Sequence, residues 1–160
     1  MSFHMHLRAA PPEEIHPDSA WVESFMLAAW ADHQEEYTAG IADSIEKDFA
    51  GVNHLYTGTP DGPTDPGIPS GLPIFGGELV PREDGPSFLI LRPQHVGETA
   101  AFLDAASFFT LWEASGAAIS ASWGNPTLAR EICLSHHEGL VRFYRAAAGA
   151  GQAVIKAFWY

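Results

Sequence analysis

Hydrophobic and polar residues alternate over 2–9, with Met5 and Leu7 on one face of an extended segment and His4 and His6 on the other. A period of two is typical of a strand that is buried on one face only. The Pro11-Pro12 pair ends the alternation, because proline cannot continue a hydrogen-bonded strand. The chain is therefore predicted to open with a half-buried strand.

Two later segments also predict strands. The run SFLIL over 87–91 is too apolar to alternate, which favours a strand covered on both faces in the middle of a sheet. Residues 152–160 follow a Gly-Ala-Gly stop and alternate again, with Val154 and Phe158 facing away from Ile155. Residues 74–80, around Gly76-Gly77, predict a short strand or an irregular segment.

Hydrophobic spacing of three and four residues predicts helices between these strands. A helix capped by Asp18 is expected to run to Gly40 with a buried stripe of Trp21, Phe25 and Ala28, which Val22, Met26 and Trp30 widen. Shorter patterns predict helices from Pro12 to Ile15, from Pro93 to about Ala106 and from Ser107, with a loop over 116–124. The Asn125-Pro126 pair predicts the start of the longest helix, which ends near Ala148.

The segment 44–57 predicts an amphipathic helix, because Ile45, Phe49, Val52 and Tyr56 recur at helical spacing and Gly58 supplies a stop. Residues 59–73 follow it and are rich in proline and glycine, which excludes regular structure. Loops of this length are uncommon unless they carry a function or are disordered.

Strands separated by helices predict a mixed α/β (α+β) fold: one three-layer domain over 1–160, with a mixed sheet and helices on both faces. A chain of 160 residues is the usual size of one domain and long enough for a real core.

The net charge and the lack of long apolar runs narrow the possible partners and locations of the protein. Twenty acidic residues against eight basic ones give a formal net charge of −12, so nucleic acid is not an expected partner. No run approaches the roughly 20 apolar residues that span a bilayer, and no signal peptide is evident. We expect a cytoplasmic bacterial protein whose partner is an unidentified protein or small molecule, with a homodimer as one option.

Three groups of residues carry the donor atoms of metal or catalytic sites, and each is incomplete. They are His4 with His6, His33 with Glu36, and Cys133 with His136 and His137. Structural zinc needs four ligands, and a reactive cysteine needs an electropositive, partly exposed place that an internal helix position does not offer. We therefore expect no metal, no cofactor and no catalytic residue, which weighs against an enzyme.

The segment SIEKDFAGVNHLYTG over 44–58, the opening strand and the closing helix–strand pair resemble the YfbM-like family of uncharacterised bacterial proteins. The matching positions are Lys47, Gly51, Leu55, Thr57, Gly58 and the turn Gly76-Gly77-Glu78. Family members typically carry a Trp-His-Gly-x-His pattern where this chain has Phe-Ala-Gly-Val-Asn over 49–53. The resemblance implies a three-layer fold and assigns no chemistry.

These observations favour a small binding or protein-interaction domain without its own catalysis. Five Trp, ten Phe and four Tyr supply aromatic anchors for such a role. The alternative is a small-molecule-binding protein or small hydrolase with a cleft beside the helix 44–57. The residues expected to line that cleft are Lys47, Asn53, His54, Tyr56 and Glu78.

Overall fold

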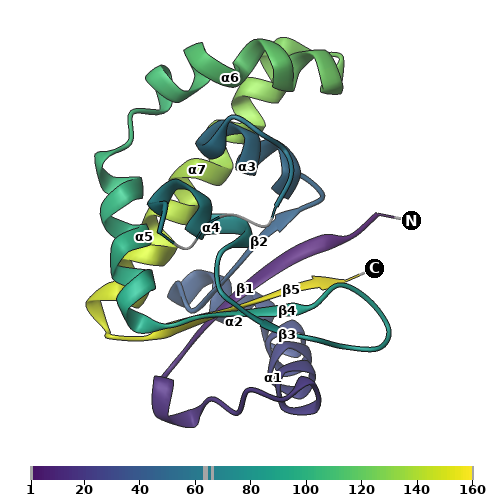
Figure 1. Ribbon diagram of the computed structural model, residues 1–160, viewed down its shortest axis with the longest axis vertical. Helices are drawn as coiled ribbons and strands as arrows, with labels where there is room; N and C mark the ends of the chain where they lie inside the picture. Colours follow the sequence, from purple (N-terminus) through teal and green to yellow (C-terminus); the bar gives the residue numbers. More distant parts are fainter. Residues whose placement is uncertain (1, 63–64, 66, 160) are drawn as a thin grey trace.

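The computed structural model describes residues 2–62, 65 and 67–159, and within them five strands form one sheet in the order β2-β1-β5-β4-β3 (Figure 1). The strands are β1 (His4–Ala10), β2 (Ala42–Glu46), β3 (Glu78–Val80), β4 (Phe88–Leu91) and β5 (Ala153–Trp159). The last strand of the chain occupies the centre of the sheet. The apolar run over 87–91 forms β4, which is buried on both faces and lies between β5 and the edge strand β3.

All four neighbouring strand pairs are antiparallel, so the expected mixed sheet is wrong, although the α+β class is confirmed. A single crossover helix would bring the chain back parallel. Here two helices connect β1 to β2 and three connect β4 to β5, and the chain returns in the opposite direction.

Helices cover both faces of the sheet, as expected for three layers. One face carries α1 (Ser19–Ala31) and α2 (His33–Ala39). The other carries α3 (Phe49–Thr57), α4 (Leu72–Phe75), α5 (Pro93–Ala105) and α7 (Pro126–Gly149), with α6 (Phe108–Trp123) packed outside against α3 and α7 (Figure 1). Short 3-10 helices lie at Pro12–Glu14 and Pro69–Gly71. No helix among the described residues is long and apolar enough to cross a membrane.

Alternation along the strands divides the core in two. Met5 and Leu7 of β1 and Phe158 of β5 belong to the larger cluster beneath α3, α5 and α7. Ile155 belongs to the smaller cluster, which lies beneath α1 with Val22 and Met26 among its members. Buried residues alternate between the two sides of β5 because both faces of this central strand are covered.

The expected helix over 18–40 is two helices. Asp18 caps α1 as predicted, accepting from the Trp21 backbone N–H, and Gly40 ends α2 in the left-handed conformation. The chain breaks at Asp32 between them. Of the residues expected on the buried stripe, Val22 and Met26 are buried, whereas Ala28 and Trp30 are exposed, so the buried face is narrower than predicted.

The expected helix over 44–57 begins only at Phe49, because residues up to Glu46 hydrogen-bond to β1 as strand β2. Ile45 nevertheless faces the same core cluster as Val52 and Tyr56. A strand, a turn and a helix thus present their apolar residues at spacings that mimic one continuous helix.

The expected loop over 116–124 is wrong, since α6 continues to Trp123 and ends at Gly124. Gly116 lies against the ring of Trp112, where a Cβ would be 2.5 Å from its Cε2 atom. The glycine serves close packing rather than a turn. The predicted loop over 59–73 is interrupted by the 3-10 helix and by the start of α4, and its residues 63, 64 and 66 lie outside the described part of the chain.

A fully buried lysine joins the central strand to α4. The Nζ atom of Lys156 donates to the carbonyl oxygens of Leu72 at 2.5 Å and Gly76 at 2.7 Å. Burial lowers the pKa of Lys156 well below its ordinary value, because a charged ammonium loses its hydration there. These bonds satisfy carbonyls of α4 and of its C-cap residue, and they fix this short helix over the sheet.

We expect replacement of Lys156 by Met to change the pH dependence of stability. In the folded protein the lysine releases its proton at a lower pH than in the unfolded chain. The free energy of unfolding of the natural protein should therefore rise with pH, relative to Lys156→Met, by up to about 1.4 kcal/mol per pH unit until roughly pH 10.4. Urea unfolding of both proteins between pH 6 and 10 measures this difference. A difference that stays flat with pH would contradict it.

Replacement of Gly76 tests the packing of α4, and replacement of Gly97 on α5 provides the comparison. A Cβ on Gly76 would lie 2.5 Å from the Leu72 Cα, which is backbone that cannot move away, so Gly76→Ala should cost about 1–3 kcal/mol. Gly97→Ala, inside α5 with open space around it, should add about 0.5–1 kcal/mol because alanine favours the helix. Chemical denaturation measures both, and a neutral Gly76→Ala would be inconsistent with the tight α4 turn.

Candidate functional site

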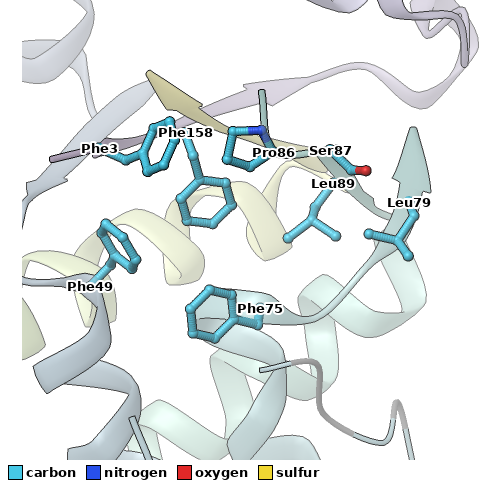
Figure 2. Close-up of a pocket in the computed structure, with 8 residues that line it drawn as sticks. All are labelled: Phe3, Phe49, Phe75, Leu79, Pro86, Ser87, Leu89 and Phe158. Carbon is cyan, nitrogen blue, oxygen red and sulfur yellow. The ribbon is translucent and has the colours of Figure 1, made fainter. Parts of the chain in front are cut away.

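A concave cleft with a volume of about 320 Å³ opens at one end of the sheet, and Figure 2 shows the side chains that line it. The two termini lie at the same end of the sheet (Figure 1). We call this cleft the phenylalanine cleft. It is lined by Phe3, Phe49, Phe75, Leu79, Pro86, Ser87, Leu89 and Phe158. Apart from the Ser87 hydroxyl, every lining side chain is apolar.

Three of the four phenylalanine rings that line the cleft contact one another (Figure 2). Phe75 stacks on Phe158 with ring centres 5.8 Å apart and planes inclined by 16°. Phe49 meets Phe158 edge-on at 5.2 Å and Phe75 edge-on at 6.0 Å. Offset-stacked and edge-on arrangements are the favoured geometries of aromatic pairs, so the rings support one another around the opening.

Each aromatic ring comes from a different element, and two of these elements end or begin at the cleft. Phe49 is the first residue of α3, Phe75 is the last of α4, and Phe158 is on β5. The Lys156 bonds hold α4, and Gly77, at a φ of 135°, lets the chain turn from α4 into β3. The rim residue Leu79, on β3, is 62% exposed.

A second cleft of about 330 Å³ lies on the other face of the sheet, and we call it the histidine cleft. It is lined by His4, His6, Met26, Leu27, Trp30, Glu46 and Trp159. The two histidines project from β1 on the face opposite Met5 and Leu7, as the strand alternation predicts. Unlike the phenylalanine cleft, it brings polar and aromatic side chains together.

Glu46 is held tightly in the histidine cleft. The His4 Nδ1 atom lies 2.6 Å from Glu46 Oε2, and the Ser44 hydroxyl donates to Oε1 at 3.0 Å. The bond from His4, with a smaller contribution from Ser44, lowers the pKa of Glu46, so the carboxylate is charged at neutral pH. Since a carboxylate only accepts, the Nδ1 atom of His4 carries the shared hydrogen.

His6 stays neutral at pH 7, because burial lowers its pKa more than the nearby Glu46 raises it. Its ring meets Trp30 edge-on at 5.2 Å, and Trp30 in turn stacks on His33 at 5.4 Å. Among the described residues, no group of three or more His, Cys, Asp or Glu side chains could hold a metal ion.

The five residues expected to line a cleft beside 44–57 go to separate places. Asn53 is buried and donates to the carbonyls of Thr59 and Asp61, so it ties the following loop to α3. The Tyr56 hydroxyl pairs with His137 in the core at 3.0 Å. These two residues support structure around α3.

The remaining three expected residues lie near the surface. Glu78 pairs with Arg92 at 3.1 Å on the exposed edge strand, Lys47 is exposed in the turn after β2, and His54 is half-buried on α3. None of the five lines either cleft. The expected place, beside α3, does hold a cleft, but its lining is apolar and was not identified from the sequence.

The thiol of Cys133 is fully buried, and burial, followed by the nearby Asp48 charge, raises its pKa to about 12. A thiol that remains protonated is a poor nucleophile. Its histidine neighbours have other partners, since His136 pairs with Asp48 at 2.9 Å and His137 with Tyr56. The Glu36 carboxylate likewise binds Arg8 rather than standing with His33 as a ligand pair.

Comparisons with known proteins give one family, whose function is unknown, and one similar fold. One solved structure of similar fold is a protein of unknown function, YfbM from Escherichia coli, with 14% identity, a TM-score of 0.63, and coverage of 97% of this chain and 99% of that one. At this identity the likeness shows the fold alone. No curated protein matches the chain. The model of a domain of unknown function, DUF1877, matches residues 1–157, and the chain therefore belongs to the DUF1877 family.

Proposed function

We propose that this protein is a non-catalytic binding domain that takes a small apolar ligand in the phenylalanine cleft. The observation that carries the proposal is the composition of the lining, in which one serine hydroxyl is the only polar side-chain group. Catalysis needs convergent acids, bases or nucleophiles, and this lining offers none.

The shape of the cleft favours a small molecule over a protein partner. A volume of about 320 Å³ is at the lower end of the range of ligand pockets, and such pockets are concave and mostly apolar. Protein interfaces are usually flatter and much larger. This geometry favours small-molecule binding, which the sequence offered as the alternative, over the protein-interaction domain that the sequence favoured.

The loop after α3 is placed to respond to a ligand. A Cβ on Gly62 would lie 2.5 Å from Cγ of Phe75, so the loop backbone rests directly on a ring that lines the cleft. Asn53 anchors the same loop through the carbonyls of Thr59 and Asp61. A ligand that contacts Phe75 would therefore also affect the packing of this loop.

Binding of a neutral solvatochromic naphthalene ketone tests the proposal. We expect saturable binding at one site with a blue-shifted emission. Because Leu79 is largely exposed, Leu79→Lys should leave the fold intact and weaken binding about fivefold, equivalent to about 1 kcal/mol of lost apolar contact. Leu128→Lys, at another exposed leucine on α7, is the matched control and should bind normally. Absence of binding, or equal loss in both variants, would refute the proposal.

Hydrogen exchange with the same probe tests the role of the loop. We expect slower exchange in the described residues of the segment 59–62 and in α4 when the probe is bound, because both pack on Phe75. Protection confined to α7, which contributes no residue to the cleft lining, would contradict this site and support an interaction surface there.

A further inference from the structure

The histidine cleft differs from the phenylalanine cleft in carrying a fixed charge. The Glu46 carboxylate lies at its rim with 57% of the side chain exposed, and no lysine or arginine in the described chain lines it. The protein as a whole carries a net charge of −12. The Glu46 carboxylate and the overall negative charge both attract a cation.

The walls of the histidine cleft suit an organic cation better than a metal ion. Trp30 and Trp159 supply aromatic surface, and Met26 and Leu27 supply aliphatic surface. Tryptophan is the best aromatic partner of a cation. A metal ion would instead need several donor atoms grouped together, which the described residues do not offer here.

Glu46 retains acceptor capacity for a ligand. A carboxylate has about four acceptor positions, and the His4 ring and the Ser44 hydroxyl occupy two of them. His6, which is neutral and whose ring makes no hydrogen bond to any described residue, adds a group in the cleft that can accept or donate.

The backbone at Glu46 is strained, with a φ of 51°, and no other described residue except glycine has a positive φ. The pairing of β1 with β2 shifts register between Met5 and His6, directly opposite this residue. Asparagine or glycine would adopt this conformation more readily. Strain of this kind persists at functional sites, where it holds a side chain in place.

We propose that the histidine cleft binds a small organic ammonium ion with an attached apolar group. The apolar group would lie against Trp30 and Trp159, and the ammonium would pair with Glu46. This site is separate from the phenylalanine cleft, on the opposite face of the sheet, and does not depend on its function.

A series of probes that share a phenylethyl group and differ in the charge of the head group tests this site by calorimetry and tryptophan fluorescence. The probes are 2-phenylethylammonium, 2-phenylethanol and 3-phenylpropanoate. We expect the ammonium to bind at least fivefold more tightly than the alcohol, and the carboxylate not to bind. Equal affinities for ammonium and alcohol, or no binding of the ammonium, would overturn the proposal.

Variants place the binding site and separate ligand contact from folding. Glu46→Gln should reduce affinity for the ammonium to that for the alcohol, while Glu113→Gln, an exposed charge on α6, should have no effect. Glu46→Asn should also lose binding but keep or raise the melting temperature, because asparagine relieves the strain. If Glu46→Gln or Trp30→Ala binds the ammonium as tightly as the natural protein does, the assignment of the site is overturned.

Discussion

The contact between Lys156 and the carbonyls of Leu72 and Gly76 is the interaction on which the arrangement of the larger face depends. A lysine on the central strand of a sheet is costly to bury, and it is tolerated here because backbone acceptors surround its Nζ atom. Helix α4 has only four residues and could not remain ordered by its own hydrogen bonds. Its attachment to the sheet places Phe75 against Phe158.

The two faces of the sheet therefore present different chemistry from the same two strands. On β5, Phe158 faces the phenylalanine cleft and Trp159 the histidine cleft. On β1, His4 and His6 face the second cleft, whereas Phe3 just before the strand lines the first. The alternation of a strand thus separates an apolar site from a charged one within a few residues.

Sequence patterns predicted most of the regular structure because local rules decided it. The cap at Asp18, the proline start at Pro126, the Gly58 stop and the alternation of β1 and β5 all depend on near neighbours. The strand β2 was missed because its hydrogen bonds go to β1, which is distant in the sequence.

The candidate sites were harder to predict from the sequence, because they too depend on contacts between residues that are distant along the chain. The phenylalanine cleft joins residues from both ends and the middle of the chain, and phenylalanines that line a cleft look like those that fill a core. The spacing of His4 and His6 did indicate a shared face. Glu46, the partner of His4, could not be identified, because it lay in a segment predicted to be helical and the pairing depends on the register between β1 and β2.

The most direct test of the apolar character of the phenylalanine cleft is a crystal structure of the protein under xenon pressure. Genuinely apolar cavities stay dry and take up xenon or benzene, whereas polar ones hold hydrogen-bonded water. The account predicts xenon among the rings of Phe49, Phe75 and Phe158. Ordered, hydrogen-bonded waters filling the cleft with no xenon between these rings would contradict it.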